Sequence, residues 1–166
     1  MTVVVGILCS DGVVIGADGA ATFGTGQVHT IEQATKKIDI INERVILAGA
    51  GQVGLHQRFK KIVEDGGSHK HFTGTTHKDH IDIGTHFTRE ALNDLASTRM
   101  PTGHYAALMA FPHKKKPYLC EFAQSDFQPE FKDDRIWFVS MGCGQPIVDP
   151  FLALIRSVFW EDGARY

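Results

Sequence analysis

The sequence lacks the features that mark several large classes of protein. No apolar run among its 166 residues is long enough to cross a bilayer. The formal net charge is −2, so the chain carries neither the excess of positive charge that attracts nucleic acid nor a strongly basic surface for membranes. No signal peptide precedes the first predicted strand. We therefore expect a cytoplasmic protein with no nucleic-acid partner and no membrane partner.

Cysteine is also scarce. Cys9, Cys120 and Cys143 are an odd number of thiols, and they show neither CxxC spacing nor the spacing of metal ligands. This pattern excludes a disulfide framework and favours reduced thiols in the cytosol.

Histidine is more abundant, and five histidines lie close together in the middle of the chain. They are His69, His71, His77, His80 and His86. None adjoins a cysteine or a carboxylate at a familiar ligand spacing. We therefore expect no metal site, and we expect these side chains to cover a solvated connection and the exposed face of a helix.

The residue pattern predicts strands and helices in one domain over residues 1–166, without a linker, repeat or low-complexity tract. β-Branched runs predict strands at Val3–Cys9, Val13–Asp18, Lys37–Ile41, Arg44–Ala48, Tyr105–Phe111, Pro117–Phe122 and Arg135–Ser140. Apolar residues at helical spacing predict helices at Gln52–Glu64, Asp79–Arg99 and Phe151–Trp160. Asp149 and Pro150 are the expected N-cap and first residue of the last helix. The pattern alone predicts a layered α+β fold.

Thr2 directly follows the initiator methionine. A short side chain at this position usually permits removal of Met1, which would leave one residue with both a nucleophilic hydroxyl and an α-amine base. The pKa of an unperturbed α-amine is about 7.7 to 8.0, close to neutrality. Threonine often follows methionine by chance, so the position alone does not predict catalysis.

Three downstream segments give Thr2 more significance. Residues 18–24 read DGAATFG, residues 34–38 read ATKKI and residues 47–51 read LAGAG. This order resembles the proteasome β-type N-terminal nucleophile hydrolases, and the first segment is most similar to their HslV-like members or the related bacterial proteasome homologue. The resemblance implies a four-layer αββα sandwich. It also implies a further helix and closing strands beyond Tyr166, which this chain does not contain.

The resemblance implies a catalytic group of Thr2, Asp18 and Lys37. The ammonium of Lys37 would favour the Thr2 alkoxide, and Asp18 would orient that ammonium and keep it charged. Lys36 is a competing candidate, because the segment between residues 22 and 37 is a few residues longer than in HslV. We favour Lys37, which directly precedes an apolar strand residue.

Further residues are assigned to the substrate by the same resemblance. The backbone N–H of Gly49 would stabilise the oxyanion, with its missing side chain letting the substrate approach. Thr22 and Ala50 would offer backbone groups to an extended peptide. Ala21, Leu47 and Gly51 would line the first specificity pocket, and these small or apolar residues predict neutral, hydrophobic side chains before the cut bond.

Cys143 departs from the family pattern. It lies in the segment Ser140–Gly144, at a position where the family usually has a serine that helps to hold the N-terminal amine. A thiol is a weaker hydrogen-bond donor and acceptor than a hydroxyl, so we expect a looser amine and a lower or differently tuned activity.

These residues predict a threonine endopeptidase that needs no cofactor. The resemblance implies stacked homo-oligomeric rings that enclose the active sites, peptides or unfolded proteins as substrates, and an ATP-dependent unfoldase as a further partner. A second interpretation is a ring-forming subunit with little or no peptidase activity, which Cys143 favours. A third is dinucleotide binding, since Gly49–Gly54 is a literal GxGxxG between a predicted strand and a predicted helix. The third lacks the second parallel strand that a Rossmann unit requires.

Overall fold

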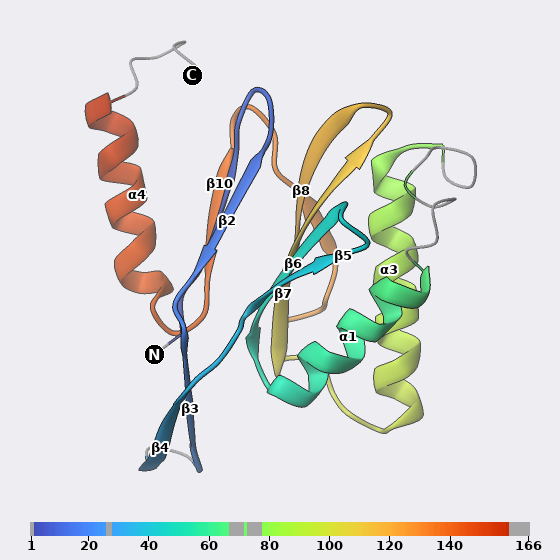
Figure 1. Cartoon of the computed structure of the whole chain (residues 1–166), viewed down its shortest axis with the longest axis vertical. Helices are drawn as coiled ribbons and strands as arrows, with labels where there is room; N and C mark the ends of the chain where they lie inside the picture. Colours follow the sequence, from blue (N-terminus) through green and yellow to red (C-terminus); the bar gives the residue numbers. More distant parts are fainter. Residues whose placement is uncertain (1, 26–27, 67–71, 73–77, 160–166) are drawn as a thin grey trace.

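Two antiparallel sheets stack face to face, with helices on both outer sides, in the computed structural model of the chain (Figure 1). The structure describes residues 2–25, 28–66, 72 and 78–159. The smaller sheet has the order β10-β1-β2, formed by Phe138–Met141, Val4–Leu8 and Val13–Ala17. The larger sheet has the order β5-β6-β7-β8-β9, formed by Ile38–Ile41, Val45–Gly51, Tyr105–His113, Lys116–Phe122 and Pro129–Phe131.

Helices cover the outer faces of this stack. Helices α1 (Val53–Gly66) and α3 (His80–Ser97) pack on the larger sheet, and α4 (Gln145–Phe159) lies outside the smaller one (Figure 1). The described part of the chain therefore has the four layers of the αββα sandwich that the resemblance implied. None of the helices within that part is both long and apolar enough to cross a membrane.

Two apolar cores hold the layers together. The first lies between the larger sheet and helices α1 and α3, and it includes Leu47, Phe59, Phe87, Met109 and Phe122. The second lies between the two sheets, and it includes Val4, Ala48, Leu108, Leu119 and Met141. Successive residues of β6 alternate between the two cores because strand side chains point to opposite faces.

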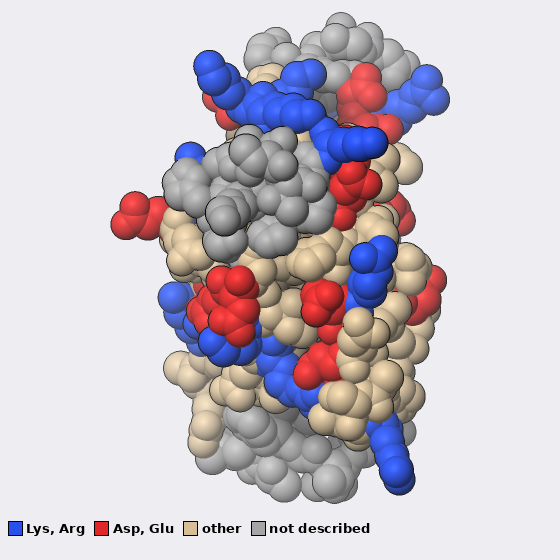
Figure 2. Space-filling model, turned by 90° about the vertical axis from the view of Figure 1, so that its right-hand side faces the viewer, with Lys and Arg blue, Asp and Glu red and all other residues tan. Residues whose placement is uncertain are grey.

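The outer face of α1 and α3 carries charges of both signs. Figure 2 shows lysine and arginine side chains interspersed with aspartate and glutamate over this face. Some of these groups pair, as in Arg58–Asp94 and Lys61–Asp65. This face of the molecule therefore has no continuous field of one sign.

Tight turns lie in the short gaps between the predicted strands. Asn42 and Glu43 join β5 to β6 with φ angles of 51° and 55°, and Lys114 and Lys115 join β7 to β8 with φ angles of 49° and 65°. Two consecutive residues with positive φ form the tight turns that match the twist of antiparallel strands.

Several element predictions are wrong. No strand was predicted between residues 19 and 36, but β3 (Ala20–Thr25) and β4 (Val28–Ala34) form a hairpin there. Strand β9 was not predicted, and β10 begins three residues later than expected. The alternation of apolar and polar residues in β4 and β9 is too short or too irregular to stand out in the sequence.

Helix α4 begins at Gln145 rather than after Asp149, so Asp149 is not its N-cap and Pro150 lies inside the helix. The carbonyl of Gly144 accepts the first helical N–H bonds, from Ile147 and Val148. The carboxylate of Asp149 is used elsewhere, because it accepts hydrogen bonds from the Ser140 hydroxyl and from the Gln145 amide.

The histidine prediction needs a correction at His80. This side chain is half-buried and stacks on Tyr118 with ring centroids 4.1 Å apart, rather than facing solvent. Its burial lowers its pKa, an effect that Asp79 opposes and His113 reinforces. His69, His71 and His77 lie outside the described residues.

Candidate active site

Thr2, Asp18 and Lys37 meet at one end of the sandwich. Thr2 precedes β1, Asp18 follows β2, and Lys37 directly precedes β5. The Lys37 Nζ donates to the Thr2 Oγ1 over 3.3 Å and to both carboxylate oxygens of Asp18 over 2.7 Å. A single ammonium therefore links the hydroxyl and the carboxylate, as the proposed catalytic group requires.

Asp18 is fixed by the backbone as well as by Lys37. Its oxygens accept from the Val3 N–H over 2.7 Å and from the Ala20 N–H over 3.1 Å. Burial alone would raise the pKa of this carboxyl, but the bonds from Lys37, Val3 and Ala20 and the charge of Lys37 together lower it. Asp18 is thus a carboxylate at neutral pH, and it holds the Lys37 ammonium in place.

Lys36 lies elsewhere. Its side chain is 76% exposed, and its Nζ is 3.8 Å from Asp39. The Lys37 side chain, by contrast, is only 9% exposed. The geometry therefore favours Lys37 for the role left open between the two lysines.

The loop from Gly142 to Gly144 holds Thr2 from the other side. The Thr2 N–H lies 3.0 Å from the Cys143 Sγ, and the Gly144 N–H donates to the Thr2 carbonyl over 3.0 Å. Gly142 has a φ of +95°, and a Cβ there would lie 2.4 Å from the Thr2 carbonyl oxygen. Glycine is therefore required at 142 for this close approach.

The Thr2 nitrogen in this contact is a peptide nitrogen, because residue 1 precedes it in the chain. It marks the position that an α-amine would take after removal of Met1. The exposed Cys143 thiol is thus next to the expected general base, at the position predicted from the family pattern.

The space left by the missing side chain of Gly49 is filled by other side chains. A Cβ on Gly49 would lie 2.5 Å from the Tyr105 hydroxyl and 2.7 Å from the His56 Nδ1. We expected this space to admit the substrate, and that expectation needs correction, because two polar side chains of the protein occupy it. The role of the Gly49 backbone N–H stays a prediction.

The residues expected to contact substrate do not line one common surface. Ala21 and Thr22 lie in β3, where they pair with Gln33 and Glu32 of β4. Ala50 is buried between the sheets.

Leu47 and Gly51 both face the helix layer. Leu47 is 0% exposed in the core beneath the helices, so in this structure it contributes to packing and not to an open pocket wall. Gly51 has a φ of +121°, and a Cβ there would lie 2.2 Å from the His104 carbonyl oxygen. Its lack of a side chain is therefore required by the backbone.

Sequence reasoning missed a hydrogen-bonded chain next to Gly49. The His56 Nδ1 lies 2.8 Å from the Tyr105 hydroxyl, and the His56 Nε2 lies 3.0 Å from Asp39. Lys60 donates to the second oxygen of Asp39 over 3.0 Å. A usable signal was Asp39 itself, a carboxylate within the otherwise apolar run of residues 38–41.

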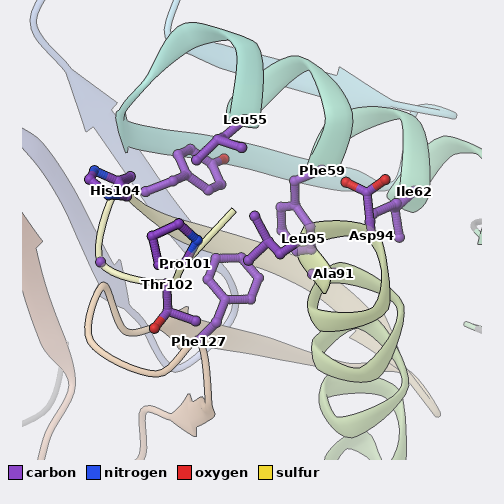
Figure 3. Close-up of a pocket in the computed structure, with 12 residues that line it drawn as sticks. Leu55, Phe59, Ile62, Ala91, Asp94, Leu95, Pro101, Thr102, His104 and Phe127 are labelled. Carbon is purple, nitrogen blue, oxygen red and sulfur yellow. The ribbon is translucent and has the colours of Figure 1, made fainter. Parts of the chain in front are cut away.

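A pocket lined in part by Tyr105 lies between α1 and α3 (Figure 3). Its volume is about 30 Å³, which is room for about one water molecule. Leu55, Phe59, Leu95 and Phe127 give it an apolar lining, and Asp94, which also lines it, is paired with Arg58. Its position and lining place it apart from the Thr2 group.

The sheet topology is incompatible with a Rossmann unit at Gly49–Gly54. Strand β6, which ends in this motif, pairs antiparallel with both β5 and β7. Dinucleotide binding by this motif requires a parallel βαβ unit. Two of these glycines instead serve close contacts, Gly49 with the Tyr105 side chain and Gly51 with the backbone of residues 104 and 105.

The stacked sheets with outer helices define the proteasome-type fold of the N-terminal nucleophile hydrolases. A family model for the proteasome subunit matches residues 2–153, and the chain belongs to this family. No curated protein matches the sequence.

Two solved structures of Anbu from Hyphomicrobium sp. strain MC1 share the fold. One has a TM-score of 0.65 at 16% identity, covering 89% of this chain and 64% of that chain. The other, a Gly-1 mutant, has a TM-score of 0.62 at 20% identity, covering 90% of this chain and 65% of that chain. The chain therefore spans about two thirds of the length of these structures.

Proposed function

We propose that the chain is a threonine peptidase in which Thr2 supplies both the nucleophile and the base. The observation that carries the proposal is the Lys37 ammonium, which lies 3.3 Å from the Thr2 Oγ1 and 2.7 Å from the Asp18 carboxylate. A cation at this position stabilises negative charge developing on the hydroxyl oxygen.

The first half-reaction transfers the acyl part of a peptide to Thr2. The Oγ1 attacks the peptide carbonyl carbon while its proton passes to the α-amine freed by loss of Met1. The Gly49 N–H stabilises the oxyanion. The tetrahedral intermediate then collapses, and the leaving amine takes the proton from the Thr2 ammonium.

The second half-reaction frees the enzyme. The Thr2 amine takes a proton from water, and the hydroxide attacks the ester carbonyl. Collapse breaks the bond to Oγ1, which regains its proton, and the carboxylic product leaves. These steps require no cofactor.

The family also suggests the setting of the reaction. Stacked homo-oligomeric rings would enclose Thr2 and restrict its substrates to peptides and unfolded proteins, and an ATP-dependent unfoldase would supply the latter. A cytoplasmic location suits such a system, as do the three cysteines, each of which is free.

A second candidate function is a ring subunit with little or no peptidase activity. The observation that favours it is Cys143, a thiol at the position of the usual serine and 3.0 Å from the Thr2 nitrogen. In this case the sandwich would serve assembly alone.

Labelling with a peptide epoxyketone distinguishes the two functions, because this warhead reacts with both the hydroxyl and the free amine of one residue. We expect intact mass spectrometry to show a chain without Met1 that gains one adduct, and Thr2→Ala to gain none. Cys143→Ala is the matched control, since it retains Thr2 and should still be labelled. A Met1-free chain that gains no adduct would contradict the peptidase proposal and support the ring-subunit function.

A further inference from the structure

Three polar side chains from separate elements form one chain of hydrogen bonds beneath α1. Asp39 comes from β5, His56 from α1 and Tyr105 from β7. Tyr105 is buried, and the side chains of His56 and Asp39 are only 15% and 13% exposed. Such a buried and fully connected chain is rigid, because moving one member leaves its neighbours without partners.

The direction of the hydrogen bonds follows from the charge states. Burial tends to raise the pKa of Asp39, but bonds from His56 and Lys60 and their charges lower it, so Asp39 is a carboxylate and accepts from the His56 Nε2–H. Burial and the charge of Asp39 raise the pKa of Tyr105 well above its ordinary value, so its hydroxyl keeps its proton. That hydroxyl can donate to the His56 Nδ1, which lies 2.8 Å away, in the tautomer of His56 that carries its proton on Nε2.

This chain lies on the helix-facing side of the larger sheet, where Tyr105 belongs to the core beneath α1 and α3. The β5–β6 register pairs Asp39 with Leu47, and Leu47 belongs to the core beneath the helices. Cross-strand partners share a face, as do alternate residues of one strand, so Asp39, Leu47 and Gly49 lie on the helix-facing side of the larger sheet. Tyr105 pairs with Gly51 and lies on this face too.

A peptide whose carbonyl reaches Thr2 and Gly49 must place the side chain before the cut bond next to Gly49. The opposite face of β6 is closed, because Ala48 and Ala50 are buried between the two sheets. On the helix-facing side, the Tyr105 hydroxyl and the His56 Nδ1 already fill the space within 2.7 Å of a Gly49 Cβ.

We propose that the Asp39–His56–Tyr105 chain forms the floor of the first specificity pocket and restricts the residue before the cut bond to short side chains such as glycine, alanine and serine. This inference rests on the proposed peptidase function. The sequence alone predicted a general preference for hydrophobic side chains before the cut bond. The structure-based inference instead limits the length of that side chain.

The test compares peptide epoxyketones that differ only in the residue attached to the warhead, which is alanine, leucine or phenylalanine. The rate of adduct formation at Thr2 is measured by intact mass. We expect the alanine probe to react about tenfold faster or more than the leucine probe, a ratio typical of steric discrimination in a closed pocket.

Two variants test the named residues. His56→Ala removes the centre of the chain, and it should raise the rate of the leucine probe relative to the alanine probe. Tyr105→Phe removes only the hydroxyl against Gly49 while retaining the ring, so it should shift the ratio in the same direction by less and keep the test valid if His56→Ala does not fold. His104→Ala, an exposed histidine next to Tyr105, is the matched control and should leave the ratio unchanged.

The outcomes separate this inference from the proposed function. A wild-type chain that reacts with the leucine probe as fast as with the alanine probe would overturn the length limit while supporting the peptidase. An unchanged ratio in both folded variants would overturn the assignment to these residues. A Met1-free chain that reacts with none of the probes would overturn the peptidase itself, and the inference with it.

Discussion

Two buried lysines in this protein form short ion pairs, yet their surroundings differ. The Lys37 side chain is 9% exposed and bonds to one carboxylate, Asp18, and to the Thr2 hydroxyl. The Lys132 side chain is 4% exposed and bonds to two carboxylates, Glu121 at 2.7 Å and Glu130 at 2.6 Å.

The difference shows why a buried ion pair is not by itself a sign of catalysis. Burial alone would lower the pKa of Lys132, but its bonds to Glu121 and Glu130 raise it, which makes this group a structural clamp between β8 and β9. Lys37 has one carboxylate to neutralise it and directs a remaining N–H at a hydroxyl. We interpret the arrangement at Lys37 as functional because its cation contacts the hydroxyl of the proposed nucleophile, Thr2.

Of the substitutions considered, Lys37→Met should cause the largest loss of activity. The change removes the cation next to Thr2 and leaves Asp18 without its partner, so we expect epoxyketone labelling and peptide hydrolysis to fall by about 10³-fold or more. Initial rates on a fluorogenic peptide measure the loss. Hydrolysis that persists within a few-fold of wild type in folded Lys37→Met protein would remove Lys37 from the mechanism.

Lys132→Met should instead lower the stability of the fold and leave the activity unchanged. Two carboxylates lose their shared partner, and we expect a loss of about 2 kcal/mol in the free energy of unfolding, with the rate per folded molecule unchanged. Urea titration followed by fluorescence measures the stability. Lys61→Met, which breaks the exposed pair with Asp65, is the control and should leave the urea midpoint where it is. The comparison fails if Lys132→Met instead abolishes activity while the fold is intact.

Cys143→Ser should raise the rate of peptide hydrolysis and so test the contact between residue 143 and the Thr2 nitrogen. A hydroxyl is the better partner for an α-amine, and a gain of about 1 kcal/mol in hydrogen bonding corresponds to about a fivefold higher rate. The readout is kcat for peptide hydrolysis, and Cys9→Ser serves as the control thiol. A slower Cys143→Ser enzyme would show that this site is adapted to the thiol.

The smallest effect concerns the pH dependence of stability. The pKa of Asp18 is lower in the folded chain than its ordinary value of 3.8, so its stabilising contribution is fully present above that value and is lost as the pH falls through the folded pKa. We expect Asp18→Asn to lower the urea midpoint at neutral pH, and the difference from wild type to shrink below about pH 4. A difference that stays constant down to about pH 2 would show that Asp18 acts through shape and not through charge.

Local patterns predicted much of the fold. The buried side chains of α3, among them Ile83, Phe87 and Ala91, are the apolar stripe read from the sequence. The turns at 42–43 and 114–115 lie in the gaps between strands that were predicted from β-branched runs. Asp149 was misread because its carboxylate bonds to Ser140, a tertiary contact that the N-cap signal cannot reveal.

The candidate site was predictable only in part. The resemblance placed Thr2, Asp18 and Lys37 in one group, and the structure brings these three side chains together. The filled space at Gly49 could not be predicted, because it depends on His56 and Tyr105, which are 49 residues apart and meet only through packing of α1 on β7.

The most direct test of the central claim is the rate of epoxyketone adduct formation at Thr2, measured side by side in wild type, Lys37→Met and Lys132→Met after confirming that Met1 is absent. We predict that Lys132→Met reacts at the wild-type rate per folded molecule and that Lys37→Met does not react measurably. Equal rates in the two variants, or an adduct that maps to a residue other than Thr2, would contradict the account.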